Sequence, residues 1–393
     1  MRKSDEHITL MEPMLPSLVS SELQDLGIDL SEKAAHLAGM VHPIVQLSIG
    51  DLVRSMNCYY SNLIEGHNTH PRDIDRALKG EFSTEPKKRE LQFEAKAHIL
   101  LQEKIDSLEM EKKKIVSIDF IRWLHEEFCK NLPDELLWAE NPDTKEKVRV
   151  EPGKFRETTV SVGRHIPPNA ESMTIFLRRF EEAYDPEKLG RMERFIAAAA
   201  SHHRLLWIHP FIDGNGRVAR LFSHSYLKVI GIGSNLWSAS RGLARKSKEY
   251  KTRLDAADAP RQGDLDGRGN LSQKGLEEFC KFFLTICIDQ ITFMESLLEA
   301  GELIRRIEIF IEEEVQAKRL LKGSFPLIRE ALLAGEFERG KAVELTGYKE
   351  RQARTVLKDL LEQGLLTSIQ IKGPVRLGFP VKVVERWFPG LYP

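Results

Sequence analysis

The sequence predicts a mainly α-helical protein with two short β-hairpins, one central and one near the C-terminus. Three observations support this fold class. Apolar residues recur at helical spacing through most of the chain between residues 90 and 294. Residues 148–163 gather valines and threonines around Pro152 and Gly153, which is typical of a hairpin. From residue 324 the pattern becomes helix, turn, helix and hairpin.

The predicted helices are recognised mainly by apolar residues at helical spacing. They cover residues 34–56, 90–115, 117–129, 173–184, 192–207, 221–230, 276–294, 302–318, 326–334, 340–345 and 350–363. With 393 residues the chain can form two or three domains. We expect a helical N-terminal region at 1–115, a core domain at 116–295, and a linker helix with a C-terminal domain at 296–393.

Composition excludes several classes of protein. A net charge of −1 gives no overall attraction to nucleic acid or to membranes. The four cysteines, Cys58, Cys129, Cys280 and Cys287, form no Cys-x-x-Cys pair, so we expect buried thiols in a reducing cytosol rather than zinc ligands or disulfides. The N-terminus lacks an apolar signal segment, and residues 279–288 reach about half of the ~20 residues that span a bilayer. The sequence therefore predicts a cytoplasmic protein with no membrane partner.

One stretch, residues 209–220 (HPFIDGNGRVAR), concentrates groups that bind phosphate. A glycine-rich turn that opens a helix directs backbone N–H groups and the positive end of the helix dipole at one point. Arg217 and Arg220 are three residues apart on one face of that helix and could bind further phosphates. Asp213 could hold a divalent metal, and neutral His209 could accept a proton near pH 7. These residue types predict a nucleotide phosphate cradle with a general base at its edge.

The same stretch resembles, position by position, the signature loop of Fic-domain proteins, His-Pro-Phe-x-Asp/Glu-Gly-Asn-Gly-Arg-x-x-Arg. The resemblance covers roughly residues 50–290 and implies a helical bundle with a β-hairpin flap. It also implies a protein adenylyltransferase, which transfers AMP from ATP to a Ser, Thr or Tyr hydroxyl of a target protein or of itself. It assigns the base to His209, Mg²⁺ to Asp213, the phosphates to Gly214, Asn215, Gly216, Arg217 and Arg220, and an adenine contact to Tyr250.

A second segment, Ser61-x-x-x-Glu65-Gly66, would by itself indicate a surface helix that ends at a glycine. Beside the loop, it resembles the family's inhibitory motif, Ser/Thr-x-x-x-Glu-Gly/Asn. The resemblance implies that Glu65 forms a bidentate contact with Arg220, with Ser61 bracing the glutamate. Arg220 would then be withheld from the γ-phosphate, and ATP would bind with its α-phosphate turned away from attack.

The predicted central hairpin resembles the Fic flap, through Gly153 and Arg156 followed by a Val-x-Val-Gly segment and Pro167-Pro168. The resemblance implies that an extended target segment docks on the edge of the flap by strand addition. The docking residues would be Thr159, Val160, Ser161, Val162 and Gly163. Many relatives carry tryptophan where Ser161 stands.

The C-terminal domain resembles a winged helix-turn-helix. Arg351, Arg354 and Lys358 lie at spacings of three and four on the candidate recognition helix and could contact phosphates. Residues 318–393 hold 14 Lys and Arg against 8 Asp and Glu. DNA is therefore one candidate partner, and a second copy of this chain is another, because a winged helix can equally serve dimerisation or regulation.

The sequence leaves two alternatives to AMP transfer open. In one, Glu65 aligns a water molecule and the enzyme removes AMP from a modified target, so that Glu65 and His209 are both catalytic. In the other, the protein is a DNA-binding regulator whose Fic core responds to nucleotide.

Overall fold

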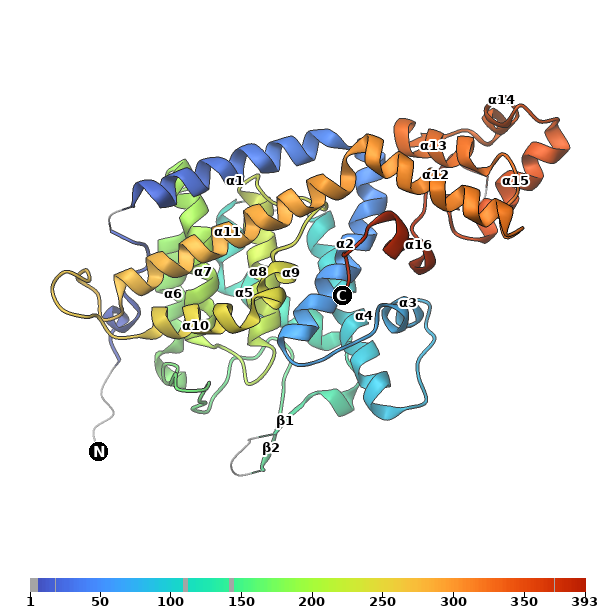
Figure 1. Cartoon of the computed structure of the whole chain (residues 1–393). Coiled ribbons are helices and arrows are strands. Elements are labelled where there is room, and N and C mark those ends of the chain that lie inside the picture. Colours follow the sequence, from blue (N-terminus) through green and yellow to red (C-terminus); the bar gives the residue numbers. More distant parts are fainter. Residues whose placement is uncertain (1–5, 18, 109–111, 141–144, 371) are drawn as a thin grey trace. The chain divides into compact units, whose positions relative to one another are not determined.

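The computed structural model describes residues 6–17, 19–108, 112–140, 145–370 and 372–393 (Figure 1). The chain divides into two compact units, and neither is continuous in sequence. Unit 1 comprises residues 1–34, 57–234 and 238–290, and unit 2 comprises residues 35–56, 235–237 and 291–393. Three long helices contribute residues to both units, namely α1 (Ser21–Met40), α2 (Pro43–Ile64) and α11 (Gln273–Leu298).

The remaining elements of unit 1 are mostly helices. The α-helices are α3 (Pro71–Leu78), α4 (Pro86–Ser107), α5 (Ile118–Lys130), α6 (Met173–Tyr184), α7 (Arg191–Ile208), α8 (Asn215–Val229), α9 (Ala239–Arg245) and α10 (Ser247–Asp258). The 3₁₀ helices and strands are η1 (Ile8–Met11), η2 (Lys112–Val116), η3 (Asp134–Leu136), η4 (Ala170–Ser172), β1 (Trp138–Glu140) and β2 (Lys147–Arg149). The mainly helical fold class is confirmed.

The core of unit 1 is built around α7 and α8, which pack side by side (Figure 1). Helix α7 also contacts α6 and α10, while α8 contacts α4, α5 and α9. From Phe195 to Ile208, almost every residue of α7 is buried. The four alanines Ala197–Ala200 let neighbouring helices approach this central helix closely. The loop between α7 and α8 is therefore held at both ends by core helices.

The sequence predicts a helix from residue 34, but α1 begins earlier, because residues 21–33 are also helical. Leu23 and Leu30 are fully buried and lie seven residues apart, which is one face of a helix. Gly27 also lies on this helix, and a β-carbon there would approach the Met192 sulfur to 2.5 Å. Close packing against α7 thus accounts for a glycine that would otherwise argue against a helix.

The hairpin predicted at residues 148–163 is wrong, because the strands lie earlier in the chain. Strands β1 and β2 pair antiparallel, with Ala139 opposite Val148, and the tip at 141–144 is outside the described residues. The following segment has no strand partner, because its polar groups bond elsewhere. The N–H of Gly153 donates to His125 Nδ1 at 2.9 Å, and the N–H of Arg156 donates to the carbonyl of Pro210 at 2.9 Å.

Unit 2 contains the C-terminal helices and a three-stranded antiparallel sheet in the order β3-β5-β4. Its elements are α12 (Ala300–Gln316), α13 (Ser324–Ala334), β3 (Glu336–Phe337), η5 (Arg339–Lys341), α14 (Ala342–Thr346), α15 (Glu350–Glu362), β4 (Leu366–Thr367), β5 (Val375–Leu377) and α16 (Val381–Trp387). The helices and the hairpin predicted after residue 324 are present. Their interpretation as a winged helix, with DNA or a second copy as partner, stays a prediction.

The candidate DNA-contacting face of α15 is largely charge-paired. Arg354 lies 2.5 Å from Glu350, and Lys358 lies 3.5 Å from Glu362, each partner one helical turn away. Exposed ion pairs of this kind contribute little stability. The glutamates nevertheless neutralise part of the positive charge that would attract a phosphate.

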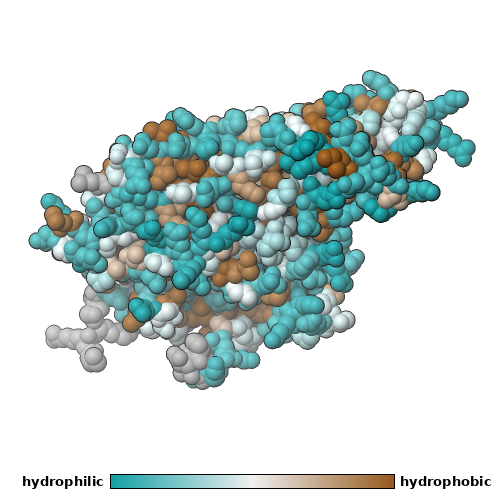
Figure 2. Space-filling view, in the orientation of Figure 1, coloured by the Kyte–Doolittle hydropathy of each residue, from teal (hydrophilic) through white to brown (hydrophobic). Residues whose placement is uncertain are grey.

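All four cysteines are buried and free, as predicted. Within the described ranges, no helix has the length and apolar character needed to cross a membrane. The face drawn in Figure 2 is mostly hydrophilic, with brown residues in small groups. Exposed large apolar side chains such as Leu265 and Ile369 lie far apart in sequence, which is ordinary for a protein surface.

The packing of α11 against α10 makes a testable prediction. A β-carbon at Gly275 would lie 2.2 Å from the backbone oxygen of Ala256, and backbone cannot move aside as a flexible side chain can. We expect Gly275→Ala to lower the unfolding free energy by about 1–3 kcal/mol, measured by thermal or denaturant unfolding. Gly39→Ala in α1 is the matched control, because a β-carbon there meets no atom within 4 Å. Equal stability of the two variants would contradict the packing.

Candidate active site

His209 ends α7 and opens the loop that leads to α8. Its backbone is left-handed, with φ 50° and ψ 62°, which is uncommon for a residue other than glycine. Gly214, which precedes α8, is also left-handed, with φ 81°. These two conformations turn the chain sharply at both ends of the loop that joins His209 to the start of α8 at Asn215.

The side chain of Asn215 closes the loop on itself. Its amide accepts from the N–H of Phe211 at 2.9 Å and donates to the carbonyl of Phe211 at 2.8 Å. Phe211 in turn stacks on the ring of His125 from α5, with centroids 3.9 Å apart. The Asn215 amide therefore stabilises the loop, whereas a phosphate would meet only its backbone N–H.

His209 is neutral at physiological pH. Burial and the nearby cation of Arg156 lower its pKa to about 4, although the Asp213 carboxylate acts in the opposite direction. A neutral imidazole can accept a proton, which is the property required of a general base.

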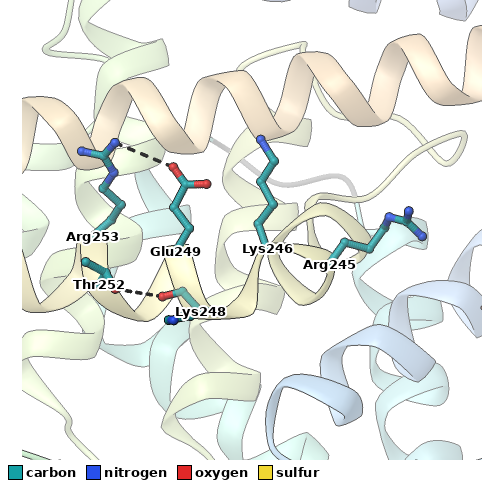
Figure 3. A pocket seen from close by; sticks show the side chains of 6 residues that line it. All are labelled: Arg245, Lys246, Lys248, Glu249, Thr252 and Arg253. Carbon is teal, nitrogen blue, oxygen red and sulfur yellow. Dashed lines mark hydrogen bonds and ion pairs between the residues drawn. The ribbon is translucent and has the colours of Figure 1, made fainter.

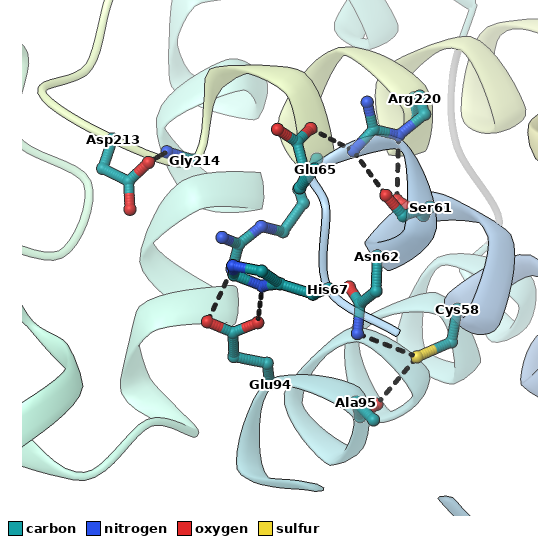
Figure 4. Close-up of polar contacts among 11 residues, drawn as sticks. Cys58, Ser61, Asn62, Glu65, His67, Glu94, Ala95, Asp213, Gly214 and Arg220 are labelled. Carbon is teal, nitrogen blue, oxygen red and sulfur yellow. Dashed lines mark hydrogen bonds and ion pairs between the residues drawn. The ribbon is translucent and has the colours of Figure 1, made fainter. Parts of the chain in front are cut away.

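The N-terminus of α8 already holds an anion, the carboxylate of Glu65 (Figure 4). A β-carbon at Gly216 would lie only 2.3 Å from Glu65 Oε1, so the carboxylate occupies the space over this glycine. The same oxygen accepts from Arg220 Nη2 at 2.5 Å. Gly216 in the first turn of α8 and Arg220 one turn later thus both border the Glu65 carboxylate, whereas phosphate binding at this position stays a prediction.

Glu65 reaches this position from the turn that ends α2. Gly66 is left-handed, and the N–H of His67 donates to the carbonyl of Asn62 at 2.9 Å, the pattern of a glycine-terminated helix. Burial acts to raise the pKa of Glu65, but the charge and hydrogen bond of Arg220 outweigh it and lower the pKa. The Glu65 carboxylate is therefore charged while it holds Arg220.

Two details of the predicted inhibitory contact are wrong. The contact is not bidentate, because only Nη2 of Arg220 donates to Glu65. Ser61 braces the arginine rather than the glutamate: its hydroxyl accepts from Arg220 Nε at 2.8 Å, and its carbonyl accepts from Nη2 at 3.1 Å. The N–H groups of the Arg220 guanidinium therefore donate to two residues, Ser61 in α2 and Glu65 in the turn that follows it.

The second arginine of the loop is also paired with a carboxylate. Arg217 Nη1 lies 3.7 Å from Glu94 Oε1 on α4, and its guanidinium covers the ring of Phe128 at 5.0 Å from the centroid. The other oxygen of Glu94 lies 2.7 Å from His67 Nδ1 (Figure 4). Glu94 therefore connects Arg217 to the turn that carries Glu65.

Tyr250, predicted to contact adenine, is buried. Its hydroxyl lies 2.7 Å from His202 Nε2, and the other ring nitrogen of His202 lies 2.7 Å from the Ser223 hydroxyl on α8. Burial and the cation of Arg220 lower the pKa of His202 to about 3, so this histidine is a neutral core residue. The adenine contact of Tyr250 stays a prediction, and its burial favours a supporting role behind Arg220.

Residues of α9 and α10 and the junction between them line an open depression of about 530 Å³ (Figure 3). Two of the cations that line the depression form ion pairs with carboxylates. Lys246 lies 3.8 Å from Asp289, and Arg253 lies 3.2 Å from Glu278. The lining residues are Arg245, Lys246, Lys248, Glu249, Thr252 and Arg253.

The residues predicted to dock a target are accessible but do not form a strand. Thr159, Ser161, Val162 and Gly163 are exposed, and Val160 is half-buried. Val162 and His165 exchange backbone hydrogen bonds of 2.9 and 3.0 Å across a tight turn. The ring of His165 lies 2.7 Å from the carbonyl of Trp207, which ties this turn to the end of α7.

Asp213 presents an exposed carboxylate at the edge of the loop, with Oδ1 accepting from the N–H of Gly214 at 2.7 Å. Among the described residues, no three His, Cys, Asp or Glu side chains gather as metal ligands. Mg²⁺ is often held by one or two carboxylates together with substrate phosphates. A single exposed carboxylate beside an anion site fits that mode of binding rather than a preformed protein cage.

The comparisons with known proteins agree with this geometry. Residues 115–227 match the model of the Fic/DOC family. The chain contains a Fic domain. "Protein adenylyltransferase Fic" from Drosophila grimshawi is 40% identical over 82 residues, which are 21% of this chain and 17% of that protein. The protein of the same name from Culex quinquefasciatus is 44% identical over 82 residues, which are 21% of this chain and 16% of that protein. The chain thus matches about a sixth of the length of these relatives.

Solved structures show that the Fic fold extends beyond the matched segment. A Fic family protein from Desulfovibrio desulfuricans aligns over 93% of this chain and 98% of its own, with TM-score 0.55 and 15% identity. Fic-1 (residues 134–508) from C. elegans aligns over 71% of this chain and 73% of its own, with TM-score 0.53 and 17% identity.

Sequence patterns do not single out two residues that the structure brings to the site. Glu94 belongs to an amphipathic helix and carries no motif, and His125 lies on the buried face of α5. His125 accepts from Gly153 and supports the loop through Phe211, while Glu94 pairs with Arg217. Neither role could be found without the fold, because each depends on contacts between distant segments.

The His67–Glu94 pair makes a pH-dependent prediction. The hydrogen bond to Glu94 raises the pKa of His67 against the opposing effect of burial. A raised pKa in the folded state means that the stabilisation is complete below pH ~6.5, the unfolded value, and is lost as pH rises through the folded pKa. In a double-mutant cycle of His67→Asn and Glu94→Gln, we expect a larger stability coupling at pH 5.5 than at pH 9.

The matched control is a second cycle in which Glu90→Gln takes the place of Glu94→Gln. Glu90 is an exposed residue one turn earlier on α4, and it should show no coupling to His67. A His67–Glu94 coupling that is independent of pH would contradict the ion pair.

Proposed function

We propose that this protein is a self-inhibited protein adenylyltransferase that transfers AMP from ATP to a hydroxyl of a protein, including its own chain. The observation that carries the proposal is the anion held between Gly216 and Arg220 at the start of α8. That position is where the phosphates of ATP would bind. The relatives named protein adenylyltransferases share sequence with part of this chain and support the same reaction.

His209 would act as the general base. Its neutral ring would take the proton from a Ser, Thr or Tyr hydroxyl of the target, and that oxygen would attack the α-phosphorus of ATP. The bond to the bridging oxygen would break, and pyrophosphate would leave as AMP joined the target. Backbone N–H groups of residues 214–216 and the guanidinium groups of Arg217 and Arg220 would bind the phosphates. Mg²⁺ held by Asp213 would supply charge neutralisation at the phosphates.

Glu65 would hold the enzyme inactive. Its carboxylate takes a hydrogen bond from Arg220 and fills the space over Gly216, so the γ-phosphate and Glu65 compete for one cation. Because phosphoryl transfer depends mainly on positioning, displacing one phosphate would suppress the reaction even if ATP still bound.

Releasing Arg220 should activate the enzyme. We expect Glu65→Gly to raise incorporation of labelled AMP into the protein by tenfold or more, and Glu65→Gln, which keeps a hydrogen-bond acceptor without the charge, to give an intermediate rise. Mass spectrometry after incubation with ATP and Mg²⁺ would identify the adduct. The control is Glu103→Gln, an exposed carboxylate on α4 outside the site. No increase with either Glu65 variant would remove the inhibitory role.

The same assay separates AMP transfer from AMP removal. If Glu65 aligns water for removal, Glu65→Gly would lose the ability to release AMP from a modified protein. Release of AMP by the unaltered protein, together with its loss in Glu65→Gly, would assign the alternative reaction.

The low pKa of His209 predicts the pH profile of the released enzyme. Since that pKa is about 4, the base is deprotonated at every pH well above this value. We expect the transfer rate of Glu65→Gly to stay level from pH 8 to about 5.5 and to fall only as the pH approaches 4.

His209→Ala should abolish transfer but retain ATP binding, measured by calorimetry. Retained transfer in that variant would exclude His209 as the base.

A further inference from the structure

Arg156 is a buried cation whose guanidinium donates hydrogen bonds to several backbone carbonyl oxygens. The residue is only 2% exposed. Nε donates to the carbonyl of His209 at 2.8 Å, Nη1 to Thr158 at 2.9 Å, and Nη2 to Pro168 at 2.5 Å. A longer bond of 3.4 Å runs from Nη2 to Ile208. Charge-assisted hydrogen bonds of this kind are stronger than neutral ones, so one side chain joins three separate pieces of backbone.

The first piece is the turn at His209. Its left-handed backbone costs conformational energy and needs neighbours that hold it. The N–H of His209 donates to Leu205 at 3.1 Å, and its carbonyl accepts from the Arg156 side chain. The next carbonyl, that of Pro210, accepts from the Arg156 backbone N–H at 2.9 Å. Arg156 thus fixes the backbone immediately after the catalytic histidine through two bonds.

The other two pieces border the segment predicted to receive the target. Thr158 directly precedes residues 159–163, and Pro168 follows them by five positions. Both carbonyls accept from the same guanidinium that holds His209. The planar fork therefore sets the spacing between the base and both ends of this segment, which a single point charge such as a lysine ammonium cannot do.

We propose that Arg156 is a positioning residue for AMP transfer, which holds the His209 ring and the 159–163 segment in the relative geometry that the reaction needs. This inference rests on the proposed function and adds a residue to it. Arg156 does not contact the reacting atoms. It acts through His209, by orientation and by charge.

The charge gives the role a distinctive signature. The groups that influence the pKa of His209, besides burial, are Arg156 and His165, which lower it, and a backbone hydrogen bond and Asp213, which raise it. Removing the cation at position 156 should raise the pKa of His209, whereas a lysine there should keep it low. Charge and geometry can thus be tested separately.

The test uses the full chain in the Glu65→Gly background, with Arg156→Lys and Arg156→Gln as variants. We expect kcat to fall about 100-fold in both, because small displacements of a base have effects of this size. KM for ATP should change less than threefold, since Arg217 and Arg220 are untouched. The acid limb of the rate profile should move to higher pH only in Arg156→Gln. Arg164→Gln, at an exposed arginine that directly follows residues 159–163, is the matched control and should match the parent.

A folded Arg156→Lys protein that keeps the parent kcat would overturn the inference, as would a loss shared equally between kcat and KM. NMR titration of the histidine rings, with His209→Gln to assign the signal, gives a readout that needs no catalysis. If Glu65→Gly transfers no AMP, the proposed function fails, and the titration then decides alone. A raised pKa of His209 in Arg156→Gln supports the positioning role, and an unchanged pKa overturns it.

Discussion

The buried guanidinium of Arg220 is the constraint on which the site depends. Its side chain is 3% exposed, and a charge so far from water requires an anion and fixed dipoles around it. Ser61 supplies a hydroxyl and a carbonyl, and Glu65 supplies the charge. Removing the glutamate leaves a buried cation without its counter-ion, which favours binding of any other anion of the right shape. In the proposed mechanism, inhibition by Glu65 and affinity for the phosphates of ATP would both follow from this electrostatic requirement of Arg220.

The loop that presents this site is shaped by backbone geometry more than by its charged side chains. Two left-handed residues, His209 and Gly214, turn the chain at either end, and Asn215 closes the turn between them. Helices α7 and α8 hold the loop at both ends because they lie in the core of unit 1. His209 consequently needs little reorganisation to accept a proton, and the main motion that the proposed reaction needs is displacement of Glu65.

Sequence patterns predict the features of this protein that depend on interactions between residues close in sequence. Helical periodicity predicts most of the helices, and the twelve-residue loop predicts the turn that joins α7 to α8 with both arginines on α8, because these features depend on neighbours in sequence. The predicted hairpin does not form because the backbone N–H groups after Pro152 bond elsewhere, that of Gly153 to His125 of α5 and that of Arg156 to Pro210 of the loop, rather than to a second strand. Glu94 was missed for the same reason: its contacts with Arg217 and His67 join segments that are distant in sequence.

Gly216 has a consequence for how this protein can change by mutation. The Glu65 carboxylate rests where any side chain at position 216 would stand, and the phosphates of ATP are proposed to use the same space. A substitution there would expel the inhibitor and obstruct the substrate together. Mutants selected for constitutive activity should therefore carry their changes in α2 and the turn after it, leaving the loop intact. Glu65 and the proposed phosphate site border the same glycine, so only Glu65 can be lost without damage to that site.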